Sequence, residues 1–150
     1  MRPIPIRCIK KWISKYGKLH PNIRIDYQSI GSGGGQKQIR EQTVDFGASD
    51  SFMSDQDLKS APGEILHIPM VLGAVVITYN LQGISQPLHF SSDVVADIFL
   101  GKIKRWDDAR IKSDNPGVNL PSADITVVHR SDGSGTTGVW ADYLSKVSAE

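Results

Sequence analysis

Residues 125–144 read ITVVHRSDGSGTTGVWADYL, in which a strand pattern passes into a helix pattern through a glycine-rich turn. The apolar run ITVVHR at 125–130 predicts a strand, and GTTGVWADYLSKV at 135–147 predicts a helix. A strand that passes into a helix through a glycine-rich turn is the repeating unit of α/β sheets. Ligands gather at such turns, because helix N-termini present free N–H groups and a partial positive charge. The stretch therefore predicts an α/β fold with an anion at this turn.

A second turn has nearly the same text a hundred residues earlier. IGSGGG at 30–35 follows the alternating run NIRIDYQSI at 22–30 and precedes a short helix. Glycine lets the backbone approach a ligand closely, and the serine of each turn, Ser32 or Ser134, can cap its helix or donate its hydroxyl outward. Both roles stay open for each serine. Two helix ends aimed at one point would make a compact anion site.

The rest of the chain also alternates between helix and strand patterns. Helical spacing occurs in IRCIKKWISKYGKL, which Gly17 should end, and in SSDVVADIFLG, which Ser91 or Ser92 should cap and Gly101 should end. Further expected strands are VDFGAS at 44–49 and LHIPMVLGAVVITYNL at 66–81, whereas residues 104–124 are mostly loop. This order favours an α/β fold with much parallel pairing.

Composition excludes several classes of function. The chain has 150 residues, with 17 basic against 16 acidic side chains, so a nucleic-acid or membrane-surface partner has no support. The single cysteine, Cys8, allows neither a disulfide framework nor a zinc site, and we expect no metal or cofactor. No apolar run reaches the ~18 residues of a membrane span. Residues near Cys8 lack the apolar core of an export signal, so none is expected in this chain.

Motifs for catalysis are weak or incomplete. The P-loop spacing that starts at Gly31 fails at Gln36 and Gln38, where a glycine and the metal-binding hydroxyl belong. The Gly-x-Gly-x-x-Gly spacing at 133–138 is a weak dinucleotide signal by itself. A hydrolase elbow around Ser131 is excluded because His129 replaces its first glycine. Nothing supplies a nucleophile with its base, so we expect no enzyme.

Two carboxylates near the turns, Asp50 and Asp132, narrow the choice of anion. A carboxylate repels a fully ionised anion, but it accepts a hydrogen bond from an anion that carries a proton. Phosphate carries a proton at neutral pH and sulfate does not, so a donor-rich site with one acceptor selects phosphate. Each Asp is either this acceptor or the anchor of Arg130. The alternative for Asp50 is a helix N-cap before SFMSDQ.

Long segments around both turns resemble one protein family. YQSIGSGGGQKQIREQTVDFGASD at 27–50, and the text from VVADIFLGKIKRWDD at 94–108 to SKVS at 145–148, resemble the phosphate-binding proteins of high-affinity ABC importers. The resemblance runs from about Trp12 to Ser148. It implies the type II periplasmic-binding-protein architecture, whose two α/β lobes close on phosphate. It also implies a periplasmic location and a membrane permease as partner.

The resemblance assigns phosphate-binding roles residue by residue. Ser32 is the expected donor of the first lobe, and Asp50 is the expected acceptor of the phosphate proton. Arg130 is the charged donor of the second lobe, oriented by Asp132. Ser134, Gly135 and Thr136 complete this set with hydroxyl and backbone N–H groups.

Two departures from the family pattern shape the expected domains. The family's initial Gly-Ala-Gly-Ala-Thr-Phe-Pro stretch is absent, and its text continues beyond Glu150. We therefore expect an architecture incomplete at both ends. Residues 1–80 should form most of lobe one, without its first strand, and residues 81–150 the first part of lobe two. The alternatives are a non-binding remnant and an enzyme that acts on phosphorylated substrates.

Overall fold

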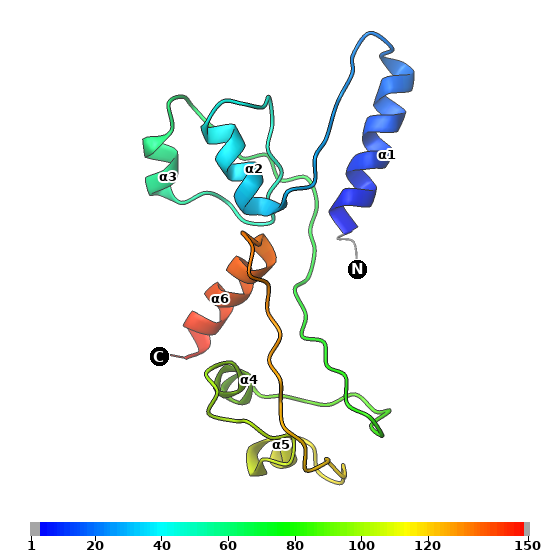
Figure 1. Ribbon diagram of the computed structural model, residues 1–150, viewed down its shortest axis with the longest axis vertical. Helices are drawn as coiled ribbons and strands as arrows, with labels where there is room; N and C mark the ends of the chain where they lie inside the picture. Colours follow the sequence, from blue (N-terminus) through cyan, green and yellow to red (C-terminus); the bar gives the residue numbers. More distant parts are fainter. Residues whose placement is uncertain (1–3, 149–150) are drawn as a thin grey trace. The chain divides into compact units, whose positions relative to one another are not determined.

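The computed structural model describes residues 4–148, which divide into two compact units, one ending at Ala74 and one beginning at Val75. Within the described residues the regular structure is helical. The helices are α1 (Ile4–Leu19), α2 (Gly31–Arg40), α3 (Asp55–Ser60), α4 (Ser92–Phe99), α5 (Ala109–Asp114) and α6 (Gly135–Val147) (Figure 1). The first three belong to the first unit and the others to the second.

The first helix is longer than its glycine predicted. We expected Gly17 to end it, but α1 continues to Leu19, and the next amide, of His20, donates to the carbonyl of Tyr16 over 2.8 Å. The Tyr16 and His20 rings also lie 4.3 Å apart, centroid to centroid. A single glycine only weakens a helix, and these contacts outweigh the weakening.

Helix α3 is tied to α2 by charge and begins at a serine cap. Ser54 caps α3, because its hydroxyl accepts a hydrogen bond from the Asp57 amide over 3.1 Å. The Asp57 carboxylate pairs with Arg40 at the end of α2, with 2.8 Å between Oδ1 and Nη1. This pair links the end of α2 to the first turn of α3.

The second unit has a small apolar core. Helix α4 contributes Val94 and α5 contributes Ile111, and Ile103 and Leu120 from the adjoining loops complete the cluster. Ile111 and Ile103 are 0% and 1% exposed. Helix α6 joins this unit through α4, where the Phe99 ring lies 5.2 Å from that of Trp140.

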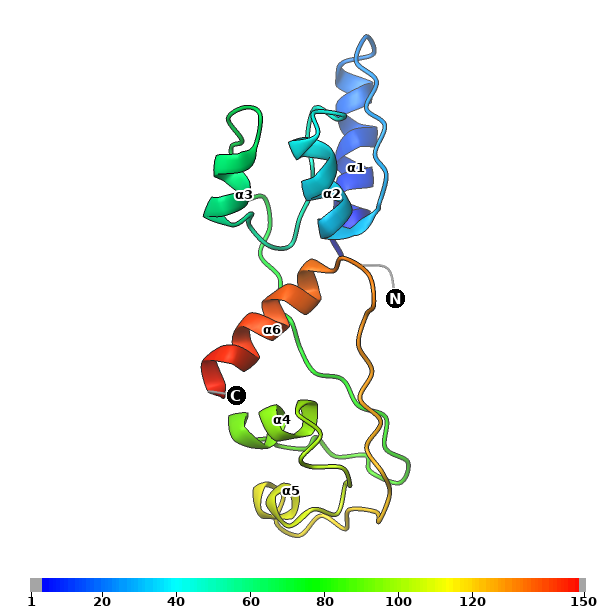
Figure 2. The same cartoon turned by 60° about the vertical axis from the view of Figure 1, so that its left-hand side comes forward.

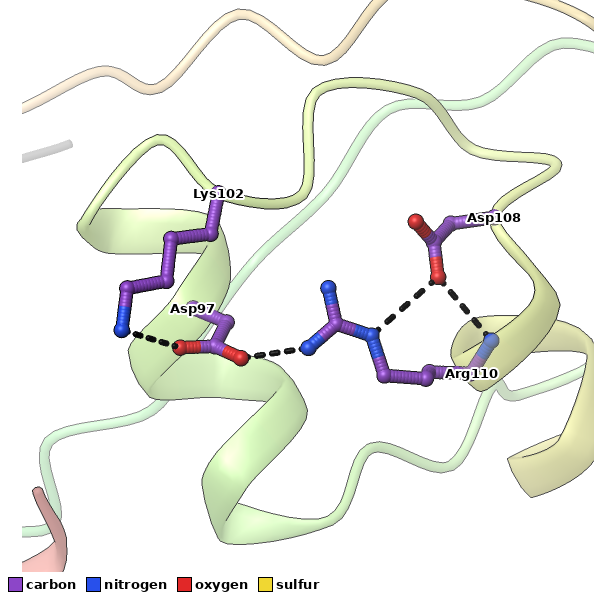
Figure 3. A network of polar contacts seen from close by, with 4 residues as sticks. All are labelled: Asp97, Lys102, Asp108 and Arg110. Atoms are coloured by element: carbon purple, nitrogen blue, oxygen red, sulfur yellow. Dashed lines mark hydrogen bonds and ion pairs between the residues drawn. The ribbon is translucent and has the colours of Figure 1, made fainter.

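Buried and exposed polar contacts reinforce this core. The Asn115 side chain exchanges two hydrogen bonds of 2.7 Å with the backbone of His89 and donates a third, of 2.9 Å, to Ile111. Figure 3 shows a second network, in which Asp97 on α4 pairs with Lys102 at 3.6 Å and with Arg110 on α5 at 2.5 Å. Both networks hold α4 and α5 together.

The expected strands do not form as paired strands. Over residues 4–148 the only ladder contact is the antiparallel bridge between Arg105 and Asp124. The segments 22–30, 44–49, 66–81 and 125–130 run as unpaired chain and are drawn as plain tubes in both views (Figure 2). A strand exists through hydrogen bonds to a neighbouring strand, so alternating residues predict a segment suited to a sheet and cannot supply its partner.

Candidate functional site

Ser134 lies at the start of α6 and caps it. Its hydroxyl accepts a hydrogen bond from the Thr137 amide over 3.2 Å, and its side chain is buried. The capping alternative is therefore confirmed for Ser134. A serine hydroxyl that accepts one bond still has its own hydrogen to donate, so capping leaves Ser134 able to bind an anion.

Gly135 and Thr136 follow Ser134 as the first residues of α6. Gly135 is buried and Thr136 is exposed. The amides of a helix's first turn have no carbonyl partner within the helix, and the helix dipole places a partial positive charge there. The start of α6 therefore offers backbone N–H groups and two hydroxyls to a negatively charged ligand.

Arg130 and Asp132 form a two-pronged ion pair just before this helix. Arg130 Nε donates to Asp132 Oδ1 over 2.8 Å, and Nη2 donates to the other carboxylate oxygen. The hydrogen bond from Arg130 holds the pKa of the Asp132 carboxyl below its ordinary value. A lowered pKa means that the pair persists at neutral pH and is lost as the pH falls through that lowered pKa. Asp132 thus fixes the plane of the guanidinium.

Ser32 has a different role in the first unit. The N-cap of α2 is Ile30, without a side-chain cap bond, and Ser32 is the second residue of the helix. The capping alternative for Ser32 is therefore wrong, because the helix begins at Gly31, two residues earlier than a cap at Ser32 would require. Ser32 is 6% exposed, and its hydroxyl accepts a hydrogen bond from the Asp50 amide over 3.0 Å. Its own hydrogen remains available to a ligand.

Asp50 is exposed, and its carboxylate forms no hydrogen bond or ion pair with residues 4–148. The alternative that Asp50 caps a helix is wrong, because α3 begins at Asp55 and Ser54 is its cap. Burial, and then the charge of Asp50, raise the pKa of the Tyr27 hydroxyl, so this phenol lies near the carboxylate. Asp50 is thus an acceptor that the helices do not use.

Sequence reasoning missed two residues of the first unit beside Asp50. Tyr27 lies within the alternating run before the turn, and its aromatic side chain predicts only a strand. Gln36 on α2 donates its amide to Ser49 Oγ and to the Ser51 carbonyl, each over 3.0 Å. A glutamine just after a glycine-rich turn carries no specific signal, because its partners lie 13 and 15 residues away.

The expected site residues fall into two groups. The structure brings Ser32 together with Asp50 in the first unit. The second unit holds the stretch from Arg130 to Thr136, with its ion pair and its helix start. Within residues 4–148 no group of side chains is suited to hold a metal ion, and no helix is long and apolar enough to cross a membrane.

Comparison with known proteins gives the family of this chain. Residues 6–149 match the PBP superfamily domain. The phosphate-binding protein PstS of Pasteurella multocida is 52% identical over 149 residues, which are 99% of this chain and 42% of that protein. PstS of Methanocaldococcus jannaschii is 47% identical over 148 residues, 95% of this chain and 38% of its own length. PstS of Haemophilus influenzae is 48% identical over 147 residues, 97% of this chain and 42% of its own length.

The chain thus spans about two-fifths of the length of these relatives. The matches confirm the predicted fold class, α/β and periplasmic-binding-protein-like, of which these residues form a part. They also confirm the resemblance that the two glycine-rich turns carried. The chain therefore belongs to the PBP superfamily.

Proposed function

We propose that this chain binds inorganic phosphate, as part of the solute-binding component of an ABC-type phosphate importer. The proposal rests on one observation: near each of two helix starts, an acidic residue lies beside a hydrogen-bond donor. Asp50 lies beside Ser32, and Asp132 lies beside Arg130. The relatives are named phosphate-binding proteins, which supports this ligand. In this proposal the protein works in the periplasm, its partner is a membrane permease, and it catalyses no reaction.

The two acceptors have different tasks in this proposal. Asp132 is occupied by Arg130 and keeps the guanidinium in one orientation for the ligand. Asp50 is unoccupied among the described residues and lies beside the buried Ser32 hydroxyl. A protonated phosphate oxygen can donate to Asp50 while another phosphate oxygen accepts from Ser32. Sulfate lacks the proton, so its oxygens would meet the Asp50 carboxylate without an intervening hydrogen.

Calorimetric titration with phosphate tests the proposal, with sulfate as the control anion. The expected result is heat of binding for phosphate and none for sulfate at the same concentration and pH. A chain that is folded by circular dichroism but shows no phosphate heat would overturn the proposal in favour of a non-binding remnant. Release of phosphate from a phosphoester would favour the enzyme instead.

Replacing Asp50 by Asn should relax the discrimination between anions. Asn keeps an oxygen that accepts the phosphate proton and removes the charge that repels sulfate. We expect phosphate to remain bound and sulfate to compete with it in the variant only. Because Asp50 caps no helix, the midpoint of thermal unfolding should barely change. The measurement is displacement of labelled phosphate by sulfate at neutral pH.

Asp45→Asn provides the matched control for this prediction. Asp45 is also an exposed carboxylate in the segment after α2, and it is outside the proposed site. The Asp45→Asn substitution removes one negative charge, as Asp50→Asn does, but leaves the Asp50 carboxylate in place. If both variants admitted sulfate equally, net charge would explain the selectivity and Asp50 would lose its specific role.

A further inference from the structure

The segment that carries Asp50 lies against α2 with backbone touching backbone. A Cβ atom on Gly35 would lie 2.5 Å from the carbonyl oxygen of Ala48. A Cβ atom on Gly47 would lie 2.6 Å from the carbonyl oxygen of Gly35. Neither contact can be relieved by turning a flexible side chain, since both partners are main-chain atoms. Glycine at both positions therefore sets how closely the helix and the segment approach.

Gln36 fixes the same segment along its length. Its amide nitrogen lies 3.0 Å from Ser49 Oγ and 3.0 Å from the Ser51 carbonyl oxygen, so one group binds both neighbours of Asp50. Ser49 Oγ in turn donates to the Ser51 carbonyl over 2.6 Å and accepts from the Ser51 amide over 3.2 Å. The turn that presents Asp50 is thus closed on itself and attached to α2.

These contacts and the Ser32 hydrogen bond lie on one face of α2. Residues three and four apart on a helix are neighbours, so Ser32, Gly35 and Gln36 form a row. The first binds the Asp50 amide, the second contacts Ala48 and the third binds Ser49 and Ser51. A shift of the segment along this row or away from it would separate the Ser32 hydroxyl from Asp50.

We propose that Gly35, Gly47 and Gln36 are positioning residues for phosphate. They hold the segment that carries Asp50 against the Ser32 hydroxyl, although none of the three is proposed to touch the ligand. This inference rests on the proposed function for its ligand. The part of the inference that concerns the contact between Ser32 and Asp50 is tested by hydrogen exchange, without any ligand.

The first test replaces Gly35 by Ala, with Gly17→Ala as the matched control. Gly17 lies within α1, and an added Cβ there meets no atom within 4 Å. We expect Gly35→Ala to speed hydrogen exchange at the Asp50 amide at least tenfold, because the Ser32 bond is lost, and to weaken phosphate binding. Gly17→Ala should leave both unchanged. Unchanged exchange at Asp50 in a folded Gly35→Ala variant would overturn the inference.

The second test replaces Gln36 by Met, which has similar length and no donor. The loss of one neutral hydrogen-bonding group should weaken phosphate binding about fivefold. The midpoint of thermal unfolding should stay near the parent value, because Gln36 is only partly buried. A residue of purely structural importance would show the opposite split, with a lower midpoint and unchanged affinity, and that result would contradict the inference.

The two proposals fail in distinguishable ways. If the parent chain binds no phosphate, the proposed function fails, while hydrogen exchange at the Asp50 amide in Gly35→Ala still decides whether Gly35 positions this residue. If the parent binds phosphate and both variants bind it equally well, the function stands. In that case the positioning role is wrong.

Discussion

Arg130→Ala should weaken phosphate binding by about 10- to 150-fold, because a charge-assisted hydrogen bond contributes about 1.5–3 kcal/mol. The variant also leaves the Asp132 carboxylate without the guanidinium that donates to it, so that this carboxylate faces the anion directly. The hydrogen bond from Arg130 is the main reason why the pKa of Asp132 is lowered, so without it this pKa should rise toward its ordinary value. At neutral pH the carboxylate remains ionised and repels phosphate.

The chain offers a matched control in Arg105. Its side chain is 48% exposed against 47% for Arg130, and it also pairs with a carboxylate two residues later, Asp107. Arg105→Ala removes the same charge from the same unit and should change the phosphate affinity little. Exposed ion pairs contribute only ~0–1 kcal/mol to stability, so both variants should unfold near the parent midpoint. Equal affinities for phosphate in the two variants would remove Arg130 from the site.

The double variant Arg130→Ala with Asp132→Asn separates attraction from repulsion. Removing the stranded carboxylate should restore part of the lost affinity, while the charged donor stays absent. Calorimetry on the parent, on Arg130→Ala, on Asp132→Asn and on the double variant completes a double-mutant cycle. Full additivity would mean that Asp132 does not act through Arg130.

Most of the helices could be predicted because their signals are local. Helix α5 was not, because residues 104–124 were expected to be mostly loop, and α2 begins within the glycine-rich turn instead of after it. Ser134 is three residues before the amide that it caps, and Gly101 follows α4 with φ +70°, a conformation that glycine adopts easily. Such signals need no distant partner. The strands could not be predicted as paired elements for the opposite reason. Residues 66–81 have an apolar pattern suited to a sheet, yet pairing depends on a neighbour that the pattern does not specify.

The contacts of the site residues also fall into local ones, which could be predicted, and distant ones, which could not. Arg130 and Asp132 are two residues apart, and their ion pair follows from the text of the turn. The hydrogen bond between Ser32 and Asp50 joins residues 18 positions apart in the sequence. The sequence predicted only that both residues bind the same ligand. Gln36 was missed because its amide acts over a similar distance on Ser49 and Ser51, which no motif marks. Contacts between residues that are close in the sequence can be predicted from it. Contacts between distant segments cannot, because packing sets how those segments approach each other.

Ile111→Ala should destabilise the second unit by about 2–5 kcal/mol, the usual cost of removing a large aliphatic side chain from a core. Ile111 is fully buried and packs with Val94, Ile103 and Leu120, so its truncation to Ala leaves a cavity within the core. Small proteins are stable by only about 5–15 kcal/mol in total, and the loss is therefore a large share. Ile111→Val should cost about 0.5–1.5 kcal/mol, and Leu100→Ala, at a residue 45% exposed, should cost less still.

Urea unfolding of a Trp12→Phe background measures this loss in the second unit alone, because Trp106 and Trp140 then supply the fluorescence. The same variant separates folding from ligand recognition. Ile111→Ala should weaken phosphate binding only as the folded fraction falls, so its apparent affinity should return to the parent value on cooling below its unfolding range. Arg130→Ala should stay weak at every temperature, since it lacks a donor. An Ile111→Ala variant that is fully folded yet still binds weakly would show that the core shapes the anion site directly.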